Sequence, residues 1–116
     1  MQPPCARSAR STFVNREAVV DQLRGAAKRL QREHPEVLRA YCFGSFAHGT
    51  PTPRSDADVL LVVASSDKPP RQRGPLFIDC FVEVSAPVDL FVLTAQEFEH
   101  AKGGVAGAAR KGLRLI

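Results

Sequence analysis

The stretch SDADVLLVV, residues 55–63, places two aspartates at the head of an apolar run that reads as a buried strand. Ionised carboxylates almost never enter a protein interior unless they are paired or hold a metal ion. Side chains alternate along a strand, so Asp56 and Asp58 point to the same face, about 7 Å apart. Two carboxylates held in this way repel each other and need a cation between them.

A third acid has the same kind of position. Asp89 is the second residue of VDLFVL, residues 88–93, which is expected to form another strand. Carboxylate oxygens form a ligand set that selects Mg²⁺ or Mn²⁺ over zinc. Asp56, Asp58 and Asp89 are therefore predicted to hold divalent ions, with two Mg²⁺ as the expected set. Asp89 is also the best candidate to help deprotonate an incoming hydroxyl.

A glycine-serine pair precedes the two aspartates. Gly44 and Ser45 end an expected strand over residues 37–43, and ten residues separate Ser45 from Asp56. Because Gly44 lacks a side chain, a ligand can approach its backbone closely. A single helical turn is expected next, with free N–H groups and the Ser45 hydroxyl directed at a phosphate. Ser55, directly before the first aspartate, is also expected to bind the nucleotide.

These positions determine the directions of the strands. The glycine turn closes the first strand and Asp56 opens the second, so the two must run antiparallel if both belong to one site. Asp89 opens the third strand, which must then run parallel to the second. The expected fold class is therefore α+β, with a small mixed sheet and helices packed on it.

The helices and loops complete the expected domain, which covers residues 15–116 after a flexible leader over 1–14. Helices are expected over 16–33 with Asn15 as N-cap, over 95–101 with Thr94 and Glu97 as a capping box, and over 105–111. Residues 65–75 contain three prolines and four charges and are predicted to be a mobile surface loop. Residues 76–84 fit a strand or a helix, and a helix is preferred as the crossover to the third strand.

Composition narrows the classes of function. The longest apolar run, residues 59–64, is far too short to cross a membrane, and the leader lacks the apolar core of a secretory signal. Three cysteines without a C-x-x-C pair indicate reduced thiols in a cytoplasm. The net charge of +4 weakly favours anionic partners. Nucleic acid is not expected as a direct ligand, because basic and aromatic residues do not interleave.

The stretches GSFAHGTPTPRSDADVLLV and PVDLFVLTAQEFE resemble the minimal nucleotidyltransferases of the DNA polymerase β superfamily. Members of that family are similar in a pattern of Gly-Ser, ten residues, Asp-x-Asp, and a later lone Asp after a Val. In this sequence the positions that match the pattern are Gly44, Ser45, Asp56, Asp58 and Asp89. The resemblance covers residues 16–116, and the ending AARKGLRLI is similar to the family's C-terminal helix. His48 departs from the pattern, because family members often carry arginine there.

The resemblance implies transfer of a nucleoside monophosphate from a triphosphate, with ATP as donor, to a hydroxyl. Many minimal members are antitoxins encoded beside a helical HEPN ribonuclease toxin, which some of them adenylylate on tyrosine. A HEPN-type toxin is therefore the expected partner. Two alternatives remain open. One is a non-catalytic binding module that neutralises its partner by contact, and the other is a transferase that acts on a small-molecule hydroxyl.

Overall fold

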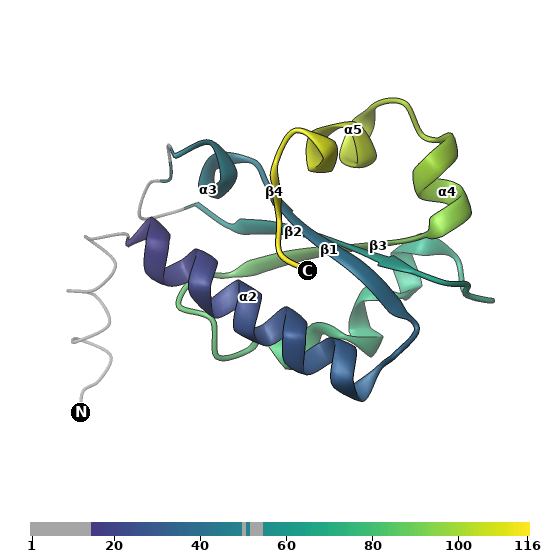
Figure 1. Cartoon of the computed structure of the whole chain (residues 1–116), viewed down its shortest axis with the longest axis horizontal. Helices are drawn as coiled ribbons and strands as arrows, with labels where there is room; N and C mark the ends of the chain where they lie inside the picture. Colours follow the sequence, from purple (N-terminus) through teal and green to yellow (C-terminus); the bar gives the residue numbers. More distant parts are fainter. Residues whose placement is uncertain (1–14, 50, 52–54) are drawn as a thin grey trace.

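A mixed sheet of four strands forms the centre of the fold (Figure 1). Its strands lie in the order β3-β2-β1-β4, and their bounds are β1 Val37–Phe43, β2 Ala57–Val63, β3 Val88–Thr94 and β4 Leu113–Arg114. β1 is antiparallel to β2, and β3 is parallel to β2. The expected α+β class and both strand directions are thus confirmed. This computed structural model describes residues 15–49, 51 and 55–116, so the expected leader lies outside the described residues.

The long helix α2 (Arg16–Glu33) covers one face of the sheet (Figure 1). It begins as expected, because the Asn15 side chain accepts a hydrogen bond of 3.0 Å from the Ala18 N–H. Its buried residues recur at helical spacing: Val19, Val20, Leu23, Ala26, Ala27 and Leu30. All of these except Val20 belong to the apolar cluster that also contains Val59, Leu61 and Val63 from one face of β2. None of the helices that the structure describes has the length and apolar character of a membrane span.

Two shorter helices, α4 (Ala95–His100) and α5 (Gly104–Arg110), cover the opposite face (Figure 1). The expected capping box is present, because Thr94 and Glu97 each accept from the other's backbone N–H. The second apolar cluster contains Leu60 and Val62 of β2 with Phe98 of α4. Because β2 is covered on both faces, its residues after Asp58 are all apolar, as its sequence indicates.

The segment between β2 and β3 differs from expectation. It forms three short 3₁₀ helices: η1 Pro70–Gln72, η2 Gly74–Leu76 and η3 Ile78–Phe81. The expectation of a surface loop is wrong at Arg73, which is only 4% exposed. The preferred α-helix over residues 76–84 is also wrong, because only one 3₁₀ turn forms there and buries Phe77 and Phe81 beside α2. Prolines in the first turns of η1 and η2 suit short helices of this kind.

Arg73 joins this segment to β3 and α4. Its guanidinium donates to the Lys68 carbonyl at 2.7 Å and to the Val92 carbonyl at 3.2 Å. It also binds both carboxylate oxygens of Glu97, at 2.6 and 3.2 Å. The hydrogen bonds that Glu97 accepts, above all from Arg73, hold the pKa of its carboxyl below the usual value. The segment therefore covers the outer edge of β3 and satisfies one of its edge carbonyls.

Replacing Arg73 with methionine is expected to lower the free energy of unfolding by about 2–4 kcal/mol, because buried hydrogen bonds to a charged group are lost. The lowered pKa of Glu97 contributes stability above the usual carboxyl range, and that stability is lost as pH falls through the folded-state value. The Arg73→Met variant should therefore lose less stability on acidification than the wild type. Urea unfolding at neutral and acid pH measures both effects. Arg71→Met is the control, since Arg71 is exposed. If Arg73→Met and Arg71→Met lower the free energy of unfolding equally, the prediction is contradicted.

The C-terminal end also differs from the sequence interpretation. The helix expected over residues 105–111 is present as α5, which ends at Arg110. The chain then turns, and the end of the stretch AARKGLRLI pairs as β4 with Tyr41 and Cys42 of β1 instead of continuing as a C-terminal helix. Gly112 permits this turn, because a Cβ there would overlap the Cys42 carbonyl oxygen. A two-residue strand carries no periodic signal that sequence reasoning could use.

Candidate functional site

The three predicted acids lie at the end of the sheet where β2 and β3 begin and β1 ends. Asp58 is the register partner of Asp89 in the parallel pair, and it lies opposite Phe43 in the antiparallel pair. Asp56 directly precedes β2, two residues before Asp58, on the same side of the alternating chain. The expected gathering of the acids therefore follows from the register of the strands.

The carboxyl group of Asp58 lies close enough to the other two acids for their charges to act on it. Partial burial raises the pKa of Asp58, and the neighbouring charges of Asp89 and Asp56 raise it further. Asp58 is half-buried, whereas Asp56 and Asp89 are exposed. Within the described part of the chain, no three acidic, histidine or cysteine side chains already converge as a complete metal site. The oxygen donors nevertheless suit Mg²⁺, and a cation among them would relieve their repulsion.

The glycine turn meets the acids directly. Gly44 has φ 79° and ψ −151°, a backbone conformation that essentially only glycine adopts. A Cβ at this position would overlap the Oδ2 atom of Asp58. The backbone at the end of β1 and the carboxylate at the start of β2 therefore lie side by side, as the antiparallel pairing of the two strands allows.

A single-turn helix, α3 (Ser45–His48), follows Gly44. The N–H groups of Ala47 and His48 both donate to the Gly44 carbonyl at 3.1 Å, so those of Ser45 and Phe46 precede the first hydrogen bond of the turn. Phe46 is 1% exposed and anchors the turn in the core. Ser45 is half-buried beside Gly44, and His48 is exposed.

Two further residues border the site. Ser55 is half-buried directly before Asp56, while residues 52–54 lie outside the described part of the chain. Cys42 is buried in β1, and burial, with a smaller contribution from Asp58, raises the pKa of its thiol to about 11. Cys42 therefore stays protonated at neutral pH and is a core residue, as its apolar neighbours predict.

Sequence reasoning missed Arg16, the first residue of α2. Its Nε donates to the Phe46 carbonyl at 2.6 Å, and its Nη2 donates to the Ala47 carbonyl at 3.1 Å. The partners lie 30 and 31 residues away in the sequence. No local pattern could have indicated these contacts, because an arginine in the first turn of a helix is ordinarily a solvated residue.

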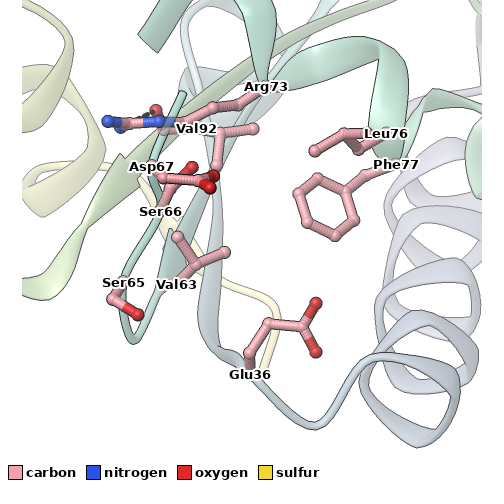
Figure 2. Close-up of a pocket in the computed structure, with 9 residues that line it drawn as sticks. All are labelled: Glu36, Val63, Ser65, Ser66, Asp67, Arg73, Leu76, Phe77 and Val92. Atoms are coloured by element: carbon pink, nitrogen blue, oxygen red, sulfur yellow. Dashed lines mark hydrogen bonds between the residues drawn. The ribbon is translucent and has the colours of Figure 1, made fainter. Parts of the chain in front are cut away.

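A pocket of about 140 Å³ lies at the opposite end of β2 (Figure 2). It is lined by Glu36, Val63, Ser65, Ser66, Asp67, Arg73, Leu76, Phe77 and Val92. Val63 ends β2 whereas Asp58 lies at its start, so about 16 Å separates the pocket from the acids along the strand. The pocket is also smaller than the roughly 300 Å³ typical of ligand sites. The acids and the glycine turn are therefore the better candidate site.

Comparisons with known proteins bear on the family and the fold of the chain. A family model described as a nucleotidyltransferase domain matches residues 23–110. No curated protein matches the chain. A solved structure from Sulfolobus solfataricus, described as that of a nucleotidyltransferase, aligns with a TM-score of 0.62 and 22% identity over 87% of this chain and 90% of the other. The structure of a toxin–antitoxin with AMP-PNP aligns with a TM-score of 0.59 and 21% identity, over 80% and 72% of the two chains. At these identities the two structures support the fold alone.

Proposed function

The chain belongs to the nucleotidyltransferase domain family, and on this basis we propose that it transfers AMP from ATP to a hydroxyl group in a Mg²⁺-dependent reaction. One observation carries the proposal: the backbone of Gly44 lies against the carboxylate of Asp58, so that a Cβ would overlap it. A phosphate at the glycine turn would consequently lie beside the acids of β2 and β3. This is the arrangement that phosphoryl chemistry at a triphosphate needs.

Each residue of the site then has a role. Gly44 and Ser45 bind phosphate oxygens through the backbone and the Ser45 hydroxyl, with Ser55 at the border of the nucleotide site. Asp56, Asp58 and Asp89 would hold two Mg²⁺ ions, which when bound stabilise the attacking and leaving oxygens. The acceptor oxygen bonds to the α-phosphorus, the bond to the β-phosphate oxygen breaks, and pyrophosphate leaves. Asp89 is exposed and takes the proton of the acceptor hydroxyl at a carboxylate oxygen.

The proposed acceptor is a hydroxyl of a HEPN-type toxin, so that the chain acts as an antitoxin by adenylylation. The sequence resemblance to minimal nucleotidyltransferases supports this choice, and one structural neighbour is a toxin–antitoxin assembly with a bound ATP analogue. The net charge of +4 would favour a partner with an acidic contact face. The same resemblance and the same structural neighbour support adenine as the preferred base of the donor nucleotide.

Co-expression with a HEPN-type toxin encoded by a neighbouring gene, followed by intact-mass measurement, tests this function. We expect a stable complex in which the toxin gains one or more AMP units when ATP and Mg²⁺ are present. The Asp58→Asn chain is the matched control, and it should leave the toxin mass unchanged. A toxin that is tightly bound but unmodified in excess ATP and Mg²⁺ would instead support the contact-only binding module. If the toxin is neither bound nor modified, a transferase acting on a small-molecule hydroxyl becomes the better interpretation.

A further inference from the structure

The turn that carries Gly44 and Ser45 has little stability of its own. It consists of one helical turn of four residues, between Gly44 at φ 79° and Gly49 at φ 80°. An isolated turn of this length is not stable in water, because forming the first hydrogen bonds costs more conformational entropy than they return. Glycine at both ends adds backbone freedom. The orientation of the turn must therefore be set by contacts with the rest of the fold.

Two contacts supply that orientation. The buried Phe46 ring fixes one side of the turn in the core. On the other side, the half-buried Arg16 guanidinium donates to two successive carbonyls, those of Phe46 and Ala47. A guanidinium suits this task because its planar fork makes two hydrogen bonds at fixed angles, which a lysine ammonium does not reproduce. Its charge also lies near the C-terminal end of α3, where a cation is favourable.

We propose that Arg16 is a positioning residue, which holds the Gly44–Ser45 turn in the orientation that binds the triphosphate. The inference rests on the proposed function, because it assigns a purpose to the orientation of that turn. Arg16 touches the carbonyls of α3 and acts on the nucleotide only through them. Removing its side chain should leave the acids of β2 and β3 in place while the phosphate-binding backbone loses its fixed position.

Arg24 provides a matched control. It lies on the same helix and is also half-buried. Burial raises the pKa of the Cys42 thiol, and the charges of Arg16 and Arg24 both act to lower it, so both charges reach the strand that leads into Gly44. Only Arg16, however, donates to the α3 carbonyls among the described contacts. Arg24→Gln therefore removes a similar charge without removing the support of the turn.

Amide hydrogen exchange on the nucleotide-free protein tests the positioning directly. In Arg16→Gln, exchange at the Ala47 and His48 amides is expected to accelerate about tenfold or more, since two hydrogen bonds from a charged group are lost. Arg16→Lys should give an intermediate rate, and Arg24→Gln the wild-type rate. Equal rates in Arg16→Gln and Arg24→Gln would overturn the inference.

Calorimetry with ATP and Mg²⁺ tests the consequence for binding. Arg16→Gln should raise the Kd about tenfold to a hundredfold at unchanged stoichiometry, because the binding groups are misplaced. A merely structural role would lower the number of competent sites while the Kd of the remaining sites stayed the same, and that result would overturn the inference. Wild-type protein without Mg²⁺-dependent binding of ATP would overturn the proposed function instead. The exchange experiment would still decide whether Arg16 holds the turn.

Discussion

Replacing Asp56 and Asp58 together by asparagine is expected to abolish nucleotidyl transfer and leave the metal-free protein as stable as the wild type or slightly more so. We expect the two acids to contribute little to holding the fold, since Asp56 is exposed and Asp58 is only half-buried. Burial and the charges of Asp89 and Asp56 raise the pKa of Asp58. A carboxyl whose pKa is higher in the folded than in the unfolded state destabilises the fold once pH rises above both values.

Asparagine removes that destabilisation at neutral pH and also removes the anionic oxygens that Mg²⁺ requires. Because metal stabilisation of the transition state is worth several kcal/mol, the rate should fall by about a thousandfold or more. Intact-mass analysis of the partner and calorimetry with ATP and Mg²⁺ measure the loss, and thermal melts in chelator measure stability. The double variant Asp21→Asn/Asp79→Asn is the control for net charge, since both residues are exposed. A large fall in the melting temperature of the site variant alone would show that the acids are structural.

The sequence sufficed for the parts of the fold that depend on local pattern. Strand β1 is mostly apolar and ends before Gly44, β2 is an apolar run headed by aspartates and expected over residues 56–63, and α2 has a helical repeat with an N-cap, so each was predicted within one residue. The direction of the strands followed from a chemical requirement, because Gly44 and Asp58 can meet only in an antiparallel pair. In the structure the two residues lie so close that a Cβ added to Gly44 would overlap the carboxylate of Asp58.

The remaining parts depend on contacts between distant residues. Arg73 is buried because Glu97, 24 residues away, accepts its hydrogen bonds, and nothing near Arg73 in the sequence indicates this. The segment from η1 to η3 follows the edge of β3 and the surface of α2, so tertiary packing selects its short 3₁₀ helices over a regular element. Arg16 is a similar case, since its partners lie 30 and 31 residues away. A periodic pattern describes one segment of the chain at a time, so it carries no information about contacts between distant residues.

Replacing Gly44 with alanine should remove Mg²⁺-dependent ATP binding at a moderate cost in stability. Two independent effects act at this residue. Its φ of 79° and ψ of −151° strain any residue with a Cβ, at about 1–3 kcal/mol. The added Cβ would also overlap Oδ2 of Asp58, so either the turn or the carboxylate must move. A displacement of about 1 Å at a reacting centre costs about a hundredfold, and we expect at least that loss in affinity and rate.

Two glycine controls separate strain from overlap. Gly49→Ala introduces a Cβ at a φ of 80° with ordinary contact distances, so it should cost about 1 kcal/mol or more of stability with much smaller loss of ATP binding. Gly103→Ala has neither a positive φ nor an atom within 4 Å of the new Cβ, and it should resemble the wild type. Urea unfolding and calorimetry with ATP and Mg²⁺ compare the three variants. If Gly44→Ala binds ATP as tightly as Gly103→Ala, then the close approach of the turn to Asp58 has no part in nucleotide binding. The triphosphate would then have to reach the acids by another route.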